Sequence, residues 1–375
     1  MTDQNLPKPS KDSAHVVVVG GGYGGVSVAK ALDPFFRVTL IEPKDNFVHT
    51  AGVLRSLTNA EWTDKVFFPY SKLLANGEIF TDAARKVTST QVALSGDHII
   101  TPDFLVLATG TSYPYPAKFL EAKANVAKAR LERTRTDLSN SRHALLVGAG
   151  PTGLELAGEL SSSFPNLKIT IVEKKPEILA GDQYLPEFRE NLLEQLQERN
   201  VEILLSTELK FLPGVDVGVN HPFTVTTTAD EKITADIWFR CFGDNRKSEY
   251  IVGDLLEAKR PDGSLKVNEH LQVSGFENIF AVGDITNVPE TKRSQAAIEH
   301  ARVVSQNIKD LAAGRAVSAS YTPLPQRILL TLGPDGGAAQ LSSQGTLRVE
   351  GPGLTATLKG GDLLAGPVSR LLGLE

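Results

Sequence analysis

The sequence has few of the residues that several protein classes require. It contains one cysteine, Cys241, which excludes an intrachain disulfide framework, a CxxC redox pair and a cysteine-rich zinc site. Its seven histidines are scattered without the spacing of a metal motif, so no metal is expected. The net charge of -5 supplies no basic field for nucleic acid, and no apolar run approaches the roughly 20 residues of a transmembrane helix. A polar N-terminus without an apolar core does not suggest a signal peptide, so a cytoplasmic location is expected.

The stretch HVVVVGGGYGGVSVAKAL (15–32) has the pattern of a dinucleotide-binding βαβ unit. A β-branched strand leads into GxGxxG and a helix, and the next strand ends in Glu42, 22 residues after Gly20. In such a unit Gly20 makes the turn, Gly22 lets the backbone approach a pyrophosphate, and Gly25 lets the helix pack closely. The acid binds a ribose, and the helix N-terminus faces the phosphates. The motif alone does not say which dinucleotide binds.

The unit is repeated further along the chain. LLVGAGPTGLELAGEL (145–160) supplies Gly148, Gly150 and Gly153, and the following strand ends in Glu173, 25 residues after Gly148. Two complete units indicate two nucleotides brought face to face, FAD held by one and a nicotinamide delivered by the other. This arrangement would relay hydride between them.

The residues that follow the second unit bear on the choice of nicotinamide nucleotide. Glu173 favours the 2′-hydroxyl of an NADH ribose and disfavours a 2′-phosphate. The adjacent Lys174 and Lys175 would instead accept the extra phosphate of NADPH. We expect NADH, with NADPH as the alternative.

Two further segments indicate that the first unit holds the flavin. FLVLATG (104–110) is an apolar strand at the point where the chain leaves the first domain, and NIFAVGD (278–284) is a strand that ends in Gly-Asp before a helical segment. In two-dinucleotide flavoproteins this aspartate, here Asp284, contacts the ribityl chain. The helix that follows directs its positive N-terminus at the flavin.

Together these segments resemble the two-dinucleotide flavoproteins of the glutathione-reductase-like fold, in the pyridine nucleotide-disulfide oxidoreductase superfamily. Within it, the chain is similar to the branch of ferroptosis suppressor proteins, apoptosis-inducing-factor-like proteins and type II NADH dehydrogenases, which lacks the redox cysteine pair. The similarity spans nearly the whole chain after about residue 14, and is carried by HVVVVGGGYGG, EPKDNFVHTAGVLRSL, LATGTSYPYPAKF, GSLKVNEHLQVSGFENIFAVGDITNV and LLTLGPDGGAAQ.

The resemblance implies an α/β fold with two Rossmann-like dinucleotide-binding domains and a small α+β C-terminal domain. The expected divisions are a flexible tail (1–13), an FAD-binding domain in two parts (14–114 and 246–321), an NAD(P)H-binding domain (115–245) and a C-terminal interface domain (322–375).

Motifs and resemblance together predict the residues of two cofactor sites. The FAD residues are Gly20, Gly22, Tyr23, Gly25, Glu42, Pro43, Lys44, His49, Arg55, Ala84, Ala108, Thr109, Gly110, Gly283, Asp284, Lys292, Gln295 and Ala296. By resemblance Lys44, His49 and Arg55 lie around the flavin, and Lys292 near the entrance to its ring. The NADH residues are Gly148, Gly150, Pro151, Thr152, Gly153, Glu155, Glu173 and Gly243.

Glu155 and Lys359 are the catalytic candidates. Glu155 follows the last glycine of the second fingerprint, with Glu159 at i+4, and both acids would also suit a helix N-terminus, where they contribute ~0.3–1 kcal/mol. In the resembled family a glutamate matching Glu155 approaches the nicotinamide and flavin, and a lysine matching Lys359 approaches from the other side. The hypothesis is that Glu155 positions the nicotinamide amide while Lys359 shapes the pocket. The alternative for Lys359 is a solvated lysine in a β-turn.

The electron acceptor must be external, because no cysteine pair is present to receive electrons, and Cys241 is predicted to be a buried strand residue. A quinone, oxygen and a small redox protein are the candidates. We expect an FAD-dependent NAD(P)H:quinone oxidoreductase, monomeric or homodimeric. The alternatives are an NADH oxidase, a ferredoxin or rubredoxin reductase, and an NADH-sensing interaction protein like apoptosis-inducing factor.

Two surface features have alternative interpretations. Val368, Leu371, Leu372 and Leu374 form an apolar stripe that either makes a peripheral membrane contact or packs on its own domain. The basic stretch EAKANVAKARLERTRTDL (121–138) is predicted to be a solvated linker helix, with contact to an anionic membrane or nucleic acid as the alternative.

Overall fold

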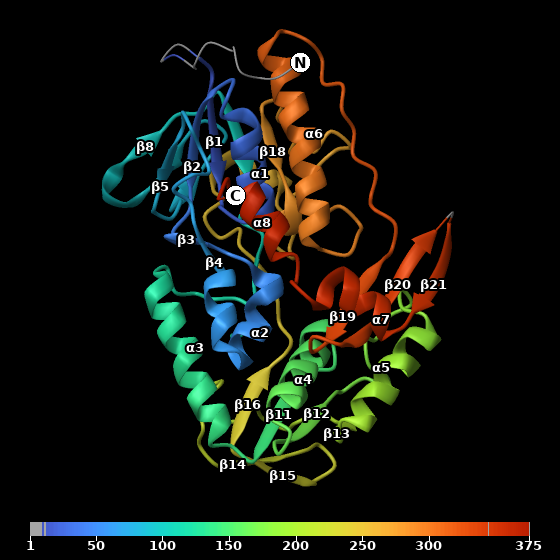
Figure 1. Ribbon diagram of the computed structural model, residues 1–375. Helices are drawn as coiled ribbons and strands as arrows, with labels where there is room; N and C mark the ends of the chain where they lie inside the picture. Colours follow the sequence, from blue (N-terminus) through green and yellow to red (C-terminus); the bar gives the residue numbers. More distant parts are fainter. Residues whose placement is uncertain (1–9, 11–12, 344, 375) are drawn as a thin grey trace.

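The computed structural model describes residue 10, residues 13–343 and residues 345–374. Nearly all of the expected tail, residues 1–13, lies outside the described residues. The molecule is elongated and has three parts (Figure 1). Two parts are built around parallel sheets, and the third is a small antiparallel sheet with short helices.

The first part is a five-stranded parallel sheet in the order β18-β9-β1-β2-β5. Its strands are β1 (His15–Val19), β2 (Arg37–Ile41), β5 (Glu78–Phe80), β9 (Phe104–Leu107) and β18 (Ile279–Ala281). The apolar strands are buried on both faces, as a doubly covered parallel sheet requires. Helices α1 (Tyr23–Leu32) and α6 (Ser294–Ala312) cover one face side by side (Figure 1). The small antiparallel sheet of β6 (Lys86–Val87), β7 (Val92–Ala93) and β8 (Ile99–Ile100) packs on the other.

The second part is a four-stranded parallel sheet in the order β13-β12-β11-β16. Its strands are β11 (His143–Val147), β12 (Lys168–Val172), β13 (Val201–Leu204) and β16 (Ile237–Arg240), and its helices are α3 (Ala124–Ser139), α4 (Pro151–Ser163) and α5 (Pro186–Glu198). A hairpin of β14 (Phe223–Thr226) and β15 (Lys232–Ala235) is attached.

The second part interrupts the first, because β18 follows β16 in sequence yet completes the first sheet. The chain enters and leaves through β10 (Thr111–Ser112) and β17 (Asn245–Arg246), which pair antiparallel. The divisions predicted at residues 114, 245 and 321 stay a prediction.

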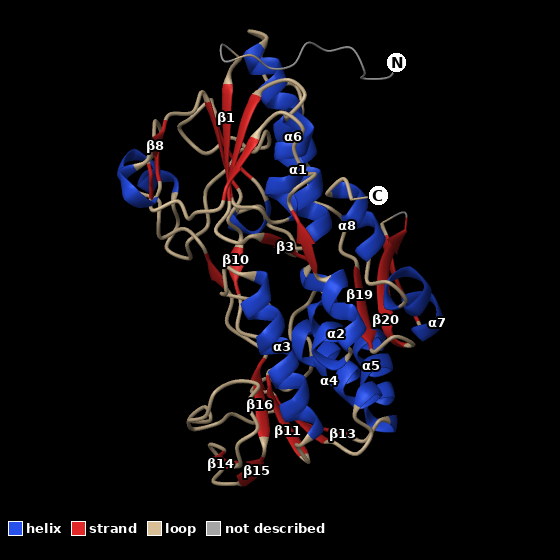
Figure 2. Cartoon of the chain, turned by 60° about the vertical axis from the view of Figure 1, so that its left-hand side comes forward, coloured by secondary structure: helices blue, strands red, loops and turns tan. Residues whose placement is uncertain are grey.

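The third part joins the other two. It comprises β19 (Ile328–Leu332), β20 (Gly336–Ser343) and β21 (Thr346–Glu350), then α7 (Pro352–Thr355), a π-helix η6 (Ala356–Gly360) and α8 (Ala365–Leu371). Strand β19 lies against α4 and β20 against α5 (Figure 2). At the first contact Gly158 is required, since a Cβ there would overlap the backbone of Leu332.

Short elements complete the connections between these strands and helices. They are β3 (Asn46–Val48), β4 (Phe67–Pro69), α2 (Val53–Thr58) and the 3₁₀ segments η1 (Thr50–Gly52), η2 (Ala60–Lys65), η3 (Ser95–Asp97), η4 (Gly253–Ala258) and η5 (Gly283–Ile285). Helix α2 contacts both α3 and α4, so it lies where the first part meets the second.

The C-terminal stripe is not an exposed surface. Val368 and Leu372 are buried in the core of the first part, and Leu371 and Leu374 pack against that core. Lys30 of α1 donates to the carbonyl oxygens of Arg370 and Leu371, at 3.0 and 2.6 Å. This packing agrees with the alternative in which the stripe packs on the protein, and a peripheral membrane contact of these residues stays a prediction. Their partner is the first part of the molecule and not the C-terminal part alone.

The basic stretch 121–138 forms most of α3 and its side chains have partners. Lys128 pairs with Asp64 at 2.8 Å, and Arg130 pairs with Glu121 at 2.7 Å. These bonds tie the helix to its neighbours, although both lysine and arginine stay partly exposed. Among the helices of the described ranges, none is long and apolar enough to cross a membrane.

Candidate active site at the junction of the three parts

The first fingerprint places three glycines for three different reasons. Gly20 has φ +108°, and a Cβ there would lie 2.5 Å from the carbonyl oxygen of Ala108. A Cβ at Gly25 would overlap the carbonyl oxygen of Gly20, so α1 packs onto the turn only because Gly25 lacks one. A Cβ at Gly22, by contrast, would meet no protein atom within 4 Å. The space that it would enter lies at the N-terminus of α1, which no side chain caps, and this fits a nucleotide pyrophosphate.

Glu42 ties this loop together from the end of β2. Its Oε2 accepts the backbone N–H of Gly21 at 2.7 Å, and its Oε1 accepts that of Lys44 at 2.9 Å. The hydroxyl of Tyr70 donates to the carbonyl oxygen of Gly21 at 2.9 Å. Burial raises the pKa of Tyr70 well above its ordinary value, and the carboxylates of Glu42 and Asp45 add to the effect. Tyr70 therefore remains a neutral hydroxyl donor beside the fingerprint.

The second fingerprint repeats the glycine geometry and the carboxylate bonds of the first. Gly148 has φ +111°, a Cβ at Gly153 would overlap the carbonyl oxygen of Gly148, and a Cβ at Gly150 would meet nothing within 4 Å. Glu173 Oε2 accepts the N–H of Ala149 at 2.8 Å, and its Oε1 accepts that of Lys175 at 2.9 Å. The sequence repeat is thus a structural repeat, and the residues of both cradles fit a dinucleotide.

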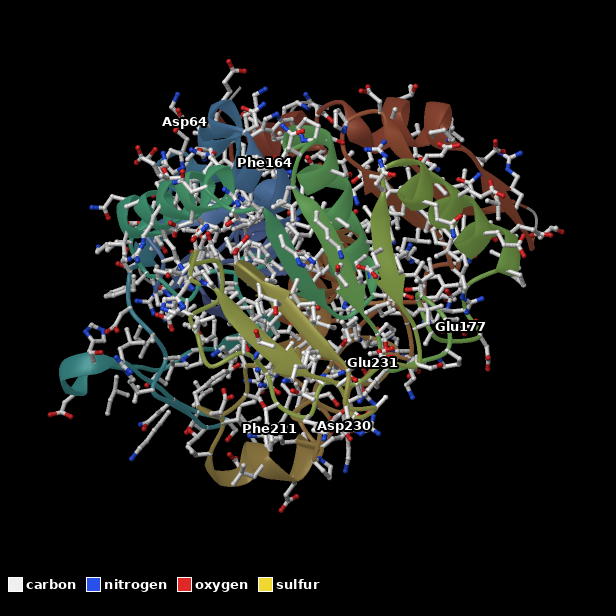
Figure 3. All side chains as sticks on the ribbon, turned by 90° about the horizontal axis from the view of Figure 1, so that it is seen from below. Asp64, Phe164, Glu177, Phe211, Asp230 and Glu231 are labelled. Carbon is white, nitrogen blue, oxygen red and sulfur yellow. The ribbon has the colours of Figure 1, made fainter. Side chains whose placement is uncertain are left out.

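A cavity of about 440 Å³ opens beside the second cradle. Its lining includes Gly148 and Glu173 of the fingerprint, and the full set is Val147, Gly148, Val172, Glu173, Lys174, Thr207, Glu208, Leu209, Lys210, Phe211, Leu212 and Phe242. Phe211 is 82% exposed at its rim, on the loop after β13 and near Asp230 of the β14–β15 turn (Figure 3). Lys210 pairs with that Asp230 at 2.5 Å. A flat apolar ring exposed at a cavity edge is typical of a ligand site.

The predicted flavin residues Gly110 and Asp284 face each other across the ends of β9 and β18, with a Cβ at Gly110 lying 4.0 Å from that of Asp284. Thr111 Oγ1 donates to Asp284 Oδ2 at 3.0 Å. Lys118 Nζ donates to the carbonyl oxygen and Oγ1 of Thr111 at 2.8 and 2.7 Å, and lies 3.8 Å from Asp284 Oδ2. Burial lowers the pKa of Lys118, which Asp284 opposes. Lys118 is a member of this cluster that the motifs did not identify.

His49 connects the first fingerprint to the third part. Its Nε2 donates to the carbonyl oxygen of Leu363 at 2.8 Å, so its Nδ1, which lies 2.8 Å from the hydroxyl of Tyr23, acts as the acceptor. Burial lowers the pKa of His49, and this favours the neutral ring that the two bonds require. Burial also raises the pKa of Tyr23 to about 12.

Glu155 and Lys359 are brought together although 204 residues separate them. Lys359 Nζ lies 2.6 Å from Glu155 Oε1 and donates to the carbonyl oxygen of Leu329 at 2.9 Å. The N–H and Oγ1 of Thr331 lie 3.4 Å from the same carboxylate oxygen. Lys359 belongs to the π-helix η6, an irregularity that occurs often at functional sites. The β-turn interpretation of Lys359 is therefore wrong.

Arg55 and Glu159 form a buried pair next to Glu155 and Lys359. Arg55 Nη2 lies 2.8 Å from Glu159 Oε1, and both side chains are 5% exposed. The guanidinium of Arg55 is directed at Glu159, because a buried carboxylate needs a charged partner. The place of Arg55 around the flavin stays a prediction. The same pairing replaces the helix-dipole interpretation of Glu159.

Three other predicted site residues have hydrogen-bond partners in the protein. Thr109 Oγ1 donates to the carbonyl oxygen of Lys247 at 2.5 Å, Lys292 Nζ donates to that of Val288 at 2.9 Å, and Gln295 accepts a bond from Arg327. Burial lowers the pKa of Lys292. Thr152 forms a side-chain hydrogen bond with Tyr113. The remaining predicted positions have no polar side-chain atom: Pro43, Ala84, Ala108, Pro151, Gly243, Gly283 and Ala296.

Cys241 is buried, as predicted, although it lies directly after β16 and not within the strand, and burial raises its pKa to about 12. A thiol of this kind is neutral and unreactive at ordinary pH.

Two nucleotide cradles with a charged pair between them define an NAD(P)H-dependent flavin oxidoreductase. The chain belongs to the pyridine nucleotide-disulphide oxidoreductase family, whose model matches residues 14–303. This membership confirms the prediction of FAD and NAD(P)H as cofactor and co-substrate.

Individual relatives agree with this membership along most of the chain. The sequence is 30% identical over 341 residues to ferroptosis suppressor protein 1 of Homo sapiens, covering 88% of each protein. It is 28% identical over 353 residues to apoptosis-inducing factor homolog A of Dictyostelium discoideum, covering 88% of this chain and 86% of that one. The fold is similar to that of NDH2 from Plasmodium falciparum in complex with NADH, with a TM-score of 0.72 at 14% identity over 95% of this chain and 97% of the other.

Proposed function

We propose that this protein is an NAD(P)H:quinone oxidoreductase in which the first fingerprint holds FAD and the second receives the nicotinamide nucleotide. The observation that carries the proposal is the Glu155–Lys359 pair, formed at 2.6 Å where the three parts meet. When bound, FAD supplies the redox chemistry by accepting a hydride equivalent from NAD(P)H and passing electrons to the acceptor. The protein supplies binding, orientation and electrostatics.

The FAD domain in this proposal comprises residues 14–114 and 246–321. Gly22 leaves room for the pyrophosphate, and Glu42 is positioned for a ribose because two backbone amides fix both of its oxygens. Asp284 and Lys118 present a carboxylate and an ammonium group at the opposite end of the cradle. A carboxylate there accepts hydrogen bonds from hydroxyl groups, and the lysine donates hydrogen bonds to a phosphate or a carbonyl oxygen.

NAD(P)H binds in this proposal to the domain of residues 115–245. The pyrophosphate lies over Gly150, and the adenosine occupies the cavity lined by Glu173 and Phe211. The ring of Phe211 provides a face on which an adenine can stack, and Glu173 accepts from the ribose. Lys174 lines the same cavity and gives a 2′-phosphate one cationic partner, so NADPH is the second candidate substrate.

Glu155 and Lys359 are assigned to the nicotinamide end. Glu155 is 22% and Lys359 18% exposed, so each reaches the junction without being sealed in the core. Glu155 Oε1 is occupied by Lys359, and a carboxylate has further lone pairs that can accept the N–H of a carboxamide. Lys359 balances the charge of Glu155 and holds it in place.

The assignment of a quinone follows from the chemistry of the acceptor. The single cysteine is buried and forms no pair, so the electrons must go to an external molecule. A quinone becomes a hydroquinone by taking up two electrons and two protons, a hydride equivalent from the reduced flavin and a proton from water, without needing a metal. Oxygen and iron–sulfur proteins are the competing acceptors.

An anaerobic experiment tests the proposal. The purified yellow protein is reduced with NADH or NADPH, and a short-chain ubiquinone, a naphthoquinone, oxygen and a ferredoxin are then added in separate reactions. We expect the quinones to reoxidise the flavin fastest. Fastest reoxidation by oxygen or ferredoxin would make the protein an oxidase or a ferredoxin reductase. Slow reoxidation by every acceptor, with NADH-dependent dimerisation, would favour an interaction protein.

A further inference from the structure

One guanidinium group, on the helix where the first part meets the second, bonds to both the second and the third part of the molecule. Arg55 of α2 donates from Nε to both oxygens of Glu159, at 3.0 and 3.2 Å, and from Nη2 to Oε1 at 2.8 Å. Its Nη1 donates to the carbonyl oxygen of Gly360, at the end of η6. Arg55 therefore connects the first part to α4 of the second part and to η6 of the third part.

The two residues that Arg55 holds stand next to the two catalytic candidates. Glu159 lies one helical turn after Glu155 on α4, so both project from a similar face. Gly360 follows Lys359 directly in η6. Arg55 thus fixes the backbone that carries Lys359 and the helix face that carries Glu155.

The pair is buried and charged, which makes its influence on the neighbouring pair strong. Glu159 and Arg55 are each 5% exposed, and the Arg55 guanidinium lies 5.0 Å from the ring centre of Trp62. Burial raises the pKa of Glu159, while the hydrogen bonds and charge of Arg55 oppose that shift. Glu155 raises it further and Lys359 lowers it, so the two ion pairs interact electrostatically across a poorly screened interior.

We propose that Arg55 and Glu159 are positioning residues for flavin reduction, and that their bond sets both the separation and the charge balance of the Glu155–Lys359 pair. This inference rests on the proposed function, in which Glu155 and Lys359 serve the nicotinamide. The pair acts through its neighbours, and its substitution changes the reduction step without removing either catalytic candidate.

A double-mutant cycle tests the inference. Glu159→Gln keeps the shape and removes the charge, and Arg55→Lys keeps the charge and removes the bidentate fork. Each is made alone and together with Lys359→Met. The rate constant of flavin reduction by saturating NADH is measured anaerobically by stopped flow, without any acceptor. Glu121→Gln is the matched control, because Glu121 pairs with Arg130 at 2.7 Å on α3, outside the site.

We expect the single variants to retain FAD and to reduce the flavin at least about five-fold more slowly, while Glu121→Gln keeps the wild-type rate. In the Lys359→Met background the same changes should slow reduction less than about two-fold, because the pair they act through is already broken. Equal slowing in both backgrounds, or wild-type rates in the single variants, would overturn the inference.

To separate an effect on folding from an effect on positioning, the reduction rates are compared only for whichever of the two variants retains FAD and unfolds cooperatively. Loss of FAD and of cooperative unfolding in both Glu159→Gln and Arg55→Lys would also overturn the inference, because the pair would then be a folding element. Because flavin reduction by NADH is measured without an acceptor, the result does not depend on whether the physiological acceptor is a quinone. Wild-type flavin that NAD(P)H does not reduce would reject the proposed function, and the inference with it.

Discussion

Alanine substitutions in the two fingerprints separate protein folding from nucleotide binding. Gly22 has φ -77° and ψ -171°, a backbone conformation that alanine adopts freely, and its Cβ would meet no protein atom within 4 Å. Gly22→Ala should therefore change the free energy of unfolding of the apoprotein by less than about 1 kcal/mol. Gly25→Ala should destabilise the protein by about 1–3 kcal/mol or more, because its methyl group would overlap the carbonyl oxygen of Gly20.

The same geometry predicts the effect on FAD. The methyl group of Gly22→Ala occupies space that the pyrophosphate needs, and a comparable steric cost of about 1–3 kcal/mol raises the dissociation constant roughly 5- to 150-fold. Titration of apoprotein with FAD, followed by flavin fluorescence, measures this constant. Urea unfolding of the same apoprotein measures stability.

Gly150→Ala is the matched substitution in the second fingerprint. It should leave FAD binding unchanged and raise the KM for NADH by the same factor, because a Cβ at Gly150 also meets no protein atom within 4 Å. Wild-type FAD affinity in Gly22→Ala would refute the reasoning. An effect of Gly150→Ala on FAD, without one on NADH, would show that the two fingerprints are assigned the wrong way round.

Four further substitutions or conditions test other parts of the account. Glu155→Ala should retain FAD and slow NADH-driven flavin reduction roughly three- to ten-fold, as the loss of one hydrogen bond predicts; unchanged stopped-flow kinetics would remove Glu155 from the site. Phe211→Ala should raise the KM for NADH about five-fold with kcat preserved, since stacking on this 82% exposed ring is worth about 1 kcal/mol; an unchanged KM in steady-state assays would exclude the stacking. Leu372→Ala should lower the free energy of unfolding, measured in urea, by about 2–5 kcal/mol, because Leu372 is 0% exposed in the core of the first part. A change below about 1 kcal/mol would mean that α8 does not pack on that core. The pKa of His49 is lowered by burial, so the folded state binds fewer protons than the unfolded state at this residue. The free energy of unfolding should therefore be fully developed above pH 6.5 and should fall as the pH drops below it. His49→Gln should flatten this dependence, which is measured by urea unfolding at successive pH values.

The central strands and the glycine turns could be predicted from the sequence because their signals are local. His15–Val19 is predicted and observed as the same strand, since a β-branched run buried on both faces has few alternatives. The first helix begins at Tyr23 and the second at Pro151, each immediately after the middle glycine of its fingerprint. The repeat between the two halves could be predicted for the same reason.

The contacts between distant segments could not be predicted from local patterns. Arg55 and Glu159 are separated by 104 residues, and no periodicity indicates that they pair. Lys118 lies between the glycine motifs and just before the basic stretch 121–138, and the crossover through β10 brings it to Asp284. The C-terminal leucines illustrate the opposite case, since their apolar spacing suits a membrane surface and a protein core equally well.

The resemblance predicts that Glu155 and Lys359 approach one site from two sides, and it does not predict the ion pair that they form at 2.6 Å. No physical rule in the sequence connects two residues 204 positions apart, and they meet because β19 packs on α4 and η6 packs on β19. The resemblance therefore assigned both residues to one site, and the bond between them is a finding of the structure.

The central claim is that one bound FAD is reduced by a nicotinamide nucleotide held at the second cradle. An anaerobic titration of the purified holoprotein with NADH, followed through the flavin absorption near 450 nm, tests it directly. The account predicts full bleaching at about one equivalent of NADH per FAD, because each hydride carries two electrons. A colourless protein that takes up no FAD, or a flavin that excess NADH and NADPH leave oxidised, would contradict it.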